Sequence, residues 1–278
     1  MTRPLLPPAR LGKYLGLALL ILGGGLPLIW ILLTSLKSED ELQKFPVQYL
    51  PTHPAWSNYA RVFSEQPFGR FFLNSMIVSG VSTLLCVAVA ALAAYALARL
   101  KLRGRTLYTT LVVVFSMFPV VSLVVPLFRI MRGAGLLNSY PALILPYTAL
   151  SLPVAILVLI AFFSGIPRDL EAAAMVDGCS RLGALWRVVV PLSAPGIVTA
   201  ALLIFVNSWN EFLLALSFNT SRTMRTVSVG VTLYQGEFAF PWPLISAAIV
   251  IAVVPLVLLI VVFQKRFVTG LTAGGVKA

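Results

Sequence analysis

Residues Ile166 to Gly196 read IPRDLEAAAMVDGCSRLGALWRVVVPLSAPG, a polar stretch between two apolar blocks. Pro167 can open a helix, because the first helical turn leaves its amide groups unpaired and proline has no amide hydrogen to lose. Asp169 and Glu171 would then lie in the first turn, where negative charge is favourable near the positive end of the helix dipole. Gly178 predicts a left-handed stop. The first half of the stretch is therefore predicted to be one short helix.

The second half of the stretch predicts another short helix. Ser180 is a suitable N-cap, and Pro191 ends this helix or kinks it into the next apolar block. One face of the second helix would carry four apolar residues, namely Leu182, Leu185, Trp186 and Val189. Two short amphipathic helices joined at a glycine, held at a membrane surface, form a shape that suits docking of another protein.

The composition indicates a polytopic membrane protein. The chain has 278 residues, of which 59% are hydrophobic and 11% charged, and its mean hydropathy is +0.95. Soluble domains carry about 25% charged residues. The net charge of +12 is typical of nucleic-acid binding in a soluble chain, but here the basic residues gather at the ends of apolar runs. We therefore predict one integral membrane domain, residues 1–278, and no nucleic-acid partner.

Six apolar runs have about the length of 20 residues that a helix needs to cross the hydrocarbon. Lys and Arg are more abundant on the segments that would be cytoplasmic, most clearly between Arg99 and Arg105, so both ends of the chain are predicted to be inside. Prolines within the third and fourth runs predict kinks. Ala90, Ala94 and Ala98, at four-residue spacing in the second run, predict a close contact with a neighbouring helix. The predicted all-α fold has spans at about 14–34, 71–98, 107–130, 141–163, 197–218 and 244–263, a loop at 164–196 and a tail at 264–278.

The loop between the fourth and fifth spans carries a family resemblance. Read as EAAAMVDG followed by VVPLSAP, it resembles the signature loop of ABC importer permeases, in which a short coupling helix docks into a cytoplasmic ATPase subunit. Sugar-type permeases have Leu-Glu-Glu-Ala-Ala before the Asp-Gly pair, and here Ala172 replaces the second glutamate. The alternative is an ordinary surface helix between two spans. The resemblance implies an ATPase-coupling role for Glu171, Ala172, Ala173, Asp177, Gly178 and Pro191.

The fifth span contains polar residues at membrane depth. Asn207, Asn210 and Glu211 fall at i, i+3 and i+4, so they would share one helix face. A carboxylate facing lipid is costly, and the face should therefore line the bundle interior or a water-filled path. Three roles stay open: contact with substrate hydroxyls, proton coupling through Glu211, and hydrogen bonds that only hold the bundle together.

Two outer segments resemble those of sugar permeases. The segment from Ser35 to Arg70, with its Asn58-Tyr59 pair, resembles a loop that faces the solute-binding protein, and the alternative is a cap on the bundle. The segment from Asn219 to Trp242 resembles the maltose-type loop that reaches into the cleft of the binding protein, and the alternative is an inert connector. The residues matching the tip of that loop are Tyr234, Gln235, Gly236 and Glu237.

The C-terminal tail is the second specific feature. Its glycines deny it a stable helix and predict disorder. However, the run GLTAGGVK closely resembles the terminal segment of the maltose-type permease, which inserts along the interface of the ATPase dimer. The resemblance assigns that contact to Gly270, Leu271, Thr272, Gly274, Gly275 and Lys277.

The chain carries no GxxxxGK[ST] phosphate-binding loop, so it cannot bind ATP by that route. His53 has no second ligand nearby, so we predict no metal site. No second acid or nucleophile accompanies Glu211, so we predict no catalytic residues.

The resemblance covers nearly the whole chain. It implies a multi-pass, maltose-transporter-type (MalG-like) permease in a bacterial cytoplasmic (inner) membrane, which moves a sugar of di- or oligosaccharide size by alternating access and contacts membrane lipid. The implied partners are a MalF-like second permease, a MalK-like ATPase homodimer that binds ATP and Mg, and an extracytoplasmic sugar-binding protein; the chain itself would bind no cofactor. Two alternatives stay open: an ABC permease for a non-sugar solute, and a proton-coupled secondary transporter that uses Glu211.

Overall fold

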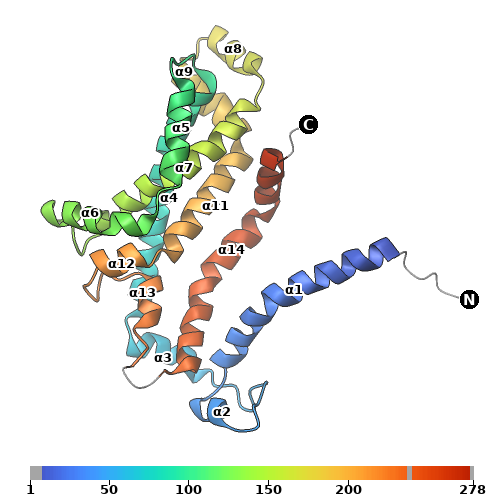
Figure 1. Cartoon of the computed structure of the whole chain (residues 1–278), viewed down its shortest axis with the longest axis vertical. Helices are drawn as coiled ribbons and strands as arrows, with labels where there is room; N and C mark the ends of the chain where they lie inside the picture. Colours follow the sequence, from blue (N-terminus) through green and yellow to red (C-terminus); the bar gives the residue numbers. More distant parts are fainter. Residues whose placement is uncertain (1–7, 237–239, 276–278) are drawn as a thin grey trace, which may run out of the picture. The chain divides into compact units, whose positions relative to one another are not determined.

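The computed structural model describes residues 8–236 and 240–275, and of these it describes residues 8–13, 15, 18 and 265–275 by their backbone alone (Figure 1). Within the described residues every element is helical, which confirms the predicted all-α fold. The elements are α1 (Pro8–Ser35), α2 (Glu39–Gln43), α3 (Ser57–Glu65), α4 (Phe68–Arg99), α5 (Arg105–Ser116), α6 (Val120–Gly133), α7 (Pro141–Ser164), α8 (Arg168–Val176), α9 (Arg181–Ala184), a π-helical turn η1 (Leu185–Val189), α10 (Val190–Leu192), α11 (Ala194–Asn210), α12 (Leu213–Phe218), α13 (Val227–Thr232) and α14 (Trp242–Gly275).

By length and hydropathy, three of the described helices could cross a membrane, and up to five could if each of two bent pairs counts as one span. The three are Phe68–Arg99, Pro141–Ser164 and Trp242–Gln264. The predicted first span, 14–34, lies within α1, whose shorter apolar part is Leu19–Ser35. Six spans are predicted. The described residues contain three unbroken helices long enough to span, and two bent pairs that raise this number to five if each pair is one span.

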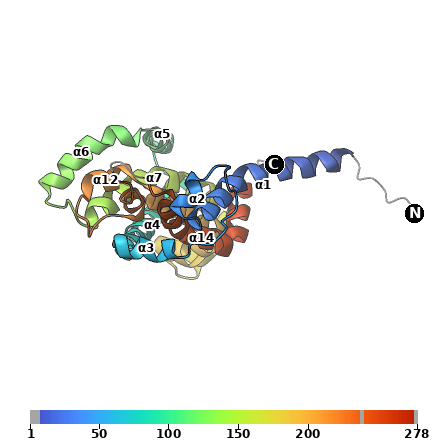
Figure 2. The ribbon, with the colours of Figure 1, turned by 90° about the horizontal axis from the view of Figure 1, so that it is seen from below.

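The predicted third span, 107–130, is not one straight helix. α5 and α6 meet at an angle of 93°, and Figure 2 shows α5 end-on while α6 runs across the view. The break falls at Pro119, which has no amide hydrogen to continue α5 and disfavours helical backbone at the residue before it. The other prolines of these spans, Pro126 in α6 and Pro146 and Pro153 in α7, stay inside their helices.

The chain divides into two compact units, one made of Met1–Pro67 and Val231–Val253 and the other of Phe68–Gly230 and Val254–Ala278. In the first unit the segment after α1 is folded, not extended. The Ser38 hydroxyl caps α2 by accepting from the Glu41 amide at 3.3 Å. Glu41 in turn accepts from the Thr52 amide at 2.9 Å and from the Thr52 hydroxyl. The Thr52 hydroxyl is the main cause of a lowered pKa of Glu41.

The Asn58-Tyr59 pair ties α3 to the end of α1 within the first unit. The Asn58 side-chain amide donates to the Ser35 and Lys37 carbonyls, each at 2.9 Å. The Tyr59 hydroxyl lies 2.7 Å from the Ser35 hydroxyl. Asn58 is 4% exposed, so these contacts give the pair a structural role.

In the second unit, α4 packs mainly against α7 and then against α11. Ala90, Ala94 and Ala98 line α4 at four-residue spacing and are buried, which lets the helices approach closely, as the sequence predicts. Gly196 at the start of α11 lies against α7, because a Cβ atom there would be 2.2 Å from Cγ of Phe162. This three-helix core positions the loop at 164–196 at one end (Figure 1).

The backbone of the C-terminal tail differs from the prediction. α14 continues to Gly275, although glycines at 270, 274 and 275 predict a non-helical tail. Each glycine costs about 1 kcal/mol in a helix, but extending a long apolar helix requires no new nucleation. Side-chain positions in the tail, and Lys277 altogether, lie outside the described residues.

Candidate functional site

The first helix of the loop begins and ends as the sequence predicts. α8 starts directly after Pro167 and carries Asp169 and Glu171 in its first turn. Gly178 has φ +90°, a left-handed conformation that favours glycine. Its amide donates to the Met175 carbonyl at 3.1 Å. The helix therefore stops at this glycine, as predicted.

The second helical segment begins at Ser180, whose hydroxyl accepts from the Gly183 amide at 3.1 Å, confirming the predicted N-cap. α9 passes into the π-helical turn η1 and then into α10. Pro191 lies in α10 and has no amide hydrogen, which weakens the helix at this point. The segment ends at Leu192, and α11 leaves it at 82°, so the predicted kink after Pro191 is present.

Only part of the apolar face predicted for the second helix is buried. Leu185 and Val189 are fully buried in the core of the second unit. Leu182 is 57% exposed and Trp186 is 49% exposed. The core therefore covers only half of this apolar face, and the other half is exposed on the surface of the loop.

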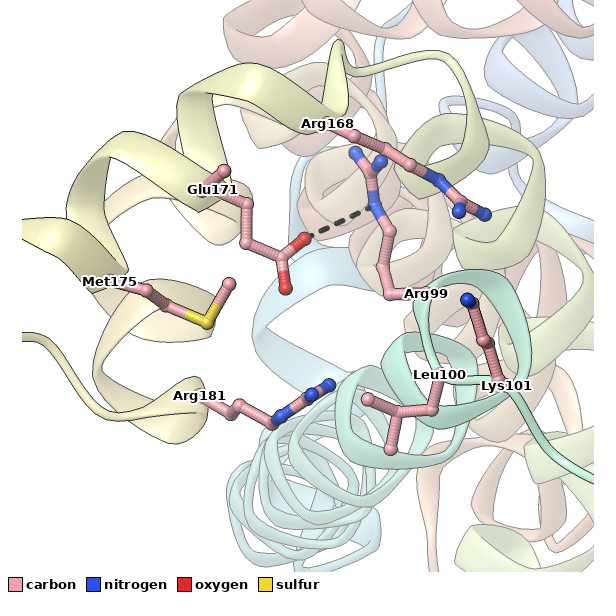
Figure 3. Close-up of a pocket in the computed structure, with 8 residues that line it drawn as sticks. Arg99, Leu100, Lys101, Arg168, Glu171, Met175 and Arg181 are labelled. Atoms are coloured by element: carbon pink, nitrogen blue, oxygen red, sulfur yellow. Dashed lines mark ion pairs between the residues drawn. The ribbon is translucent and has the colours of Figure 1, made fainter.

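Glu171 is the centre of a buried cluster inside this chain. Its side chain faces the C-terminal end of α4 (Figure 3). The Tyr95 hydroxyl donates to Glu171 Oε1, and Arg99 Nε lies 3.7 Å from Glu171 Oε2. Arg99 also donates through Nη2 to the Ile166 carbonyl at 2.7 Å. Glu171, Tyr95 and Arg99 are each less than 10% exposed, so this cluster fastens α8 to α4.

Sequence reasoning missed Tyr95 and Arg99. They lie four residues apart near the end of α4 and therefore on one face of that helix. A tyrosine and an arginine at that spacing, directly before the basic run that ends at Arg105, were the available signal.

The other residues assigned to coupling lie on the surface. Ala172, Ala173, Asp177, Gly178 and Pro191 are exposed. Close to them, Leu170 is 46% exposed and Val176 is 87% exposed. The exposed side of α8 is thus mostly apolar after the charged Arg168 and Asp169 at its start, whereas the Glu171 carboxylate points inward.

Glu211 does not share a helix face with Asn207 and Asn210, which corrects the prediction. α11 ends at Asn210, and Glu211 has extended backbone with ψ 128°. Its carboxylate accepts from the Leu214 amide at 2.8 Å and the Ala215 amide at 3.1 Å.

The Tyr147 hydroxyl donates to the Glu211 carboxylate at 2.5 Å. The helix breaks because this carboxylate caps α12 and bonds to α7, and the predicted span 197–218 is therefore interrupted. These bonds correspond to the alternative in which Glu211 holds the bundle together.

Asn207 lies beside a cavity of about 260 Å³ between α7 and α11. Ser151 also lines the cavity, and its hydroxyl is buried without a hydrogen-bond partner among the described residues. Asn207 and Asn210 are both exposed. The side chains of both asparagines are therefore accessible on the surface of α11, whereas Glu211 lies beyond the end of this helix.

The residues assigned to binding-protein contact differ from one another. Tyr234 is 6% exposed, and its hydroxyl donates to the Val62 carbonyl of α3 at 2.5 Å. Burial is the main cause of a raised pKa of Tyr234. Gln235 and Gly236 are exposed, and Glu237 lies outside the described residues. Within the described part of this loop, Tyr234 anchors the segment and Gln235 is available to a partner.

Known proteins resemble this chain in sequence and in fold. The family model for the binding-protein-dependent transport system inner membrane component matches residues 86–272. This range covers well over half of the chain and includes the whole loop at 164–196. The chain belongs to the family of binding-protein-dependent transport system inner membrane components.

Individual relatives align with almost all of the chain. The sulfoquinovosyl glycerol transport system permease protein SmoH of Agrobacterium fabrum is 57% identical, covering 95% of this chain and 93% of SmoH. The trehalose/maltose transport system permease protein MalG of Thermococcus litoralis is 42% identical, covering 90% of this chain and 91% of MalG.

A chain in the crystal structure of a bacterial ABC transporter that imports the acidic polysaccharide alginate superposes with a TM-score of 0.82 at 23% identity. The match covers 95% of this chain and all of that chain. It shows that the two chains share a fold.

Proposed function

We propose that this chain is the permease subunit of an ATP-driven ABC importer that carries a sugar of di- or oligosaccharide size across a bacterial cytoplasmic membrane. One observation carries the proposal: the loop at 164–196 presents an exposed and mostly apolar helix, and its only glutamate fastens that helix to α4. Relatives whose names specify sulfoquinovosyl glycerol or trehalose and maltose support a carbohydrate as the substrate.

The topology belongs to the same proposal. The chain forms one permease domain with six spans, three of them α4, α7 and the apolar part of α14, and both ends lie in the cytoplasm. The basic run from Arg99 to Arg105 at the end of α4 supports this orientation, since Lys and Arg accumulate on the cytoplasmic side. The loop at 164–196 then lies in the cytoplasm as well, within reach of an ATPase.

The partners follow from the loops. A MalK-like ATPase homodimer, which binds ATP and Mg²⁺ itself, docks on the exposed side of α8 and on the C-terminal tail, and this chain hydrolyses nothing. A MalF-like second permease completes the translocation path. An extracytoplasmic sugar-binding protein meets the outer segments, where Gln235 and Gly236 are exposed. An alginate transporter solved with its periplasmic binding protein superposes at a TM-score of 0.58.

The mechanism is alternating access driven through α8. Closure of the ATPase dimer displaces α8, and the Tyr95–Glu171–Arg99 cluster passes that displacement to α4, which is packed against α7 and α11. Because packed helices move as rigid bodies, a shift at the loop becomes a rotation of the bundle. The exposed Asn207 and Asn210 are the polar groups on α11 that a sugar hydroxyl can reach.

Proton coupling through Glu211 receives less support. Its carboxylate accepts hydrogen bonds from two backbone amides and from Tyr147, which is a complete structural role. An ABC permease for a non-sugar solute stays as the second alternative, because the coupling loop does not depend on the solute.

The first test is to tag the chain, solubilise native membranes gently and identify the co-purifying proteins by mass spectrometry. We expect an ATPase, a second permease and a binding protein, and the ligand of that binding protein names the substrate. Charge reversal at the exposed Asp177, or Gly178→Pro, is expected to uncouple ATP hydrolysis from transport. A chain that purifies alone and still transports after reconstitution would refute the proposal.

A further inference from the structure

A basic cavity lies between the end of α4 and the loop helices (Figure 3). Its volume is about 590 Å³. Three chain segments converge on it: the residues that end and follow α4, one side of α8 from Arg168 to Met175, and the start of α9. Four of the lining residues are cations and one is an acid, namely Arg99, Lys101, Arg168, Arg181 and Glu171.

The charges around this cavity are not balanced within the described chain. Glu171 faces Arg99, and Arg99 Nε makes no hydrogen bond there despite its burial. The side chains of Lys101, Arg168 and Arg181 have no hydrogen-bond or ion-pair partner among the described residues. Like charges gathered in a partly enclosed space repel one another, and the walls of low polarity focus their field. The cavity therefore attracts an anion.

The position of the cavity indicates which anion it is. α4 has 32 residues and is about 48 Å long at 1.5 Å per residue, slightly more than the roughly 40–45 Å of a bilayer with its headgroups. The end of α4 thus reaches the headgroup layer. Leu100 and Met175 also line the cavity and provide apolar surface beside the cations. Both features fit an amphiphilic anion.

We propose that this cavity binds the phosphate group of an anionic phospholipid, with Lys101, Arg168 and Arg181 as the ligands and Leu100 and Met175 against the glycerol and upper acyl region. Arg168 is the first residue of α8 and Arg181 is the first residue of α9. A bound phosphate therefore ties both loop helices to the end of α4. The site adjoins the side of α8 that the proposed ATPase contact uses, since Ala172 lines the cavity as well, but its three cationic ligands lie outside the residues assigned to that contact.

The test measures lipid retention by the full chain with any subunits it keeps. The purified protein is delipidated and titrated with phosphatidylglycerol or phosphatidylcholine, and bound lipid is counted by native mass spectrometry. We expect preferential retention of phosphatidylglycerol. Each lost cation should weaken that binding about fivefold, so Lys101→Gln/Arg181→Gln should weaken it roughly 25-fold. Both side chains are exposed, and folding should be unaffected.

A matched control removes two other positive charges close to the cavity. Arg103→Gln/Arg187→Gln changes one residue in each of the same two segments, and neither residue lines the cavity. Equal losses in both double variants, or equal retention of the two lipids, would overturn the proposal. Stabilisation by inorganic phosphate without lipid retention would identify free phosphate as the ligand and overturn the lipid assignment.

A third outcome concerns protein partners. If Lys101→Gln/Arg181→Gln released a co-purifying ATPase while leaving phosphatidylglycerol bound, the cavity would hold an acidic protein side chain, and the lipid proposal would be wrong. Lipid retention is measured without reference to transport, so failure of the importer function and failure of this site are distinguishable.

Discussion

Glu171→Ala should detach α8 from the end of α4. The variant removes the acceptor of the Tyr95 hydroxyl and leaves Arg99, whose side chain is 3% exposed, charged and buried without its partner. Removing one member of a buried ion pair costs about 3–5 kcal/mol. Because the cost is local, it should appear as opening of the loop helix more than as loss of the whole bundle.

Hydrogen exchange of residues 168–176 in the purified chain measures that opening directly. A loss of about 3 kcal/mol corresponds to exchange roughly 100-fold faster, provided that α8 exchanges by detachment. Asp169→Asn is the matched control, because it removes an exposed carboxylate from the same helical turn. Exchange in Glu171→Ala no faster than in Asp169→Asn would refute the reasoning.

A second variant identifies the cause of the effect. Arg99→Met in the Glu171→Ala background removes the stranded charge while keeping a long apolar side chain. We expect this double variant to recover part of the lost protection, since the penalty comes mainly from an unpaired buried cation. The double variant could instead lose as much protection as the Glu171→Ala and Arg99→Met single variants lose together. That result would show that the two side chains act independently.

Three further predictions concern other parts of the chain. Gly196→Ala should lower the thermal stability by about 1–3 kcal/mol, because the added Cβ would meet Phe162 at 2.2 Å, and Phe162→Leu in the same chain should recover part of the loss. Gly178→Ala should lower the free energy of unfolding by about 1–2 kcal/mol, because alanine is strained in the left-handed backbone conformation of Gly178. Gly178→Asn should lower it by less, and melting curves of the two variants would measure the difference. The lowered pKa of Glu41 stabilises the first unit above the ordinary value of 4.5, and this stability is lost as the pH falls through the folded pKa. Thr52→Val should reduce that acid dependence, and an unchanged pH profile would contradict the assignment.

Features that depend on neighbouring residues could be predicted from the sequence. The bounds of α8 follow from Pro167 and Gly178, and the cap of α9 follows from Ser180, because each is a local backbone effect. The small residues on α4 likewise predicted a close helix contact, since spacing along one helix determines its face.

Features that depend on distant contacts could not be predicted. The break after Asn210 exists because the Glu211 carboxylate accepts a hydrogen bond from Tyr147, 64 residues away in the sequence. No local sequence pattern predicts that hydrogen bond. The inward direction of Glu171 depends in the same way on Tyr95 and Arg99. A helical face read from spacing alone assumes a continuous helix, and this assumption failed where a side chain competed for backbone amides.

The π-helical turn over Leu185–Val189 has a mechanical consequence for the loop. A π-helical turn accommodates one residue more than an α-helical turn, and one residue corresponds to about 100° of rotation and 1.5 Å of rise. The turn therefore fixes the direction in which the preceding segment presents its side chains. Deleting one residue from it would restore α-helical register and swing the exposed Leu182 through roughly a quarter of a revolution, without any change to the surface residues themselves.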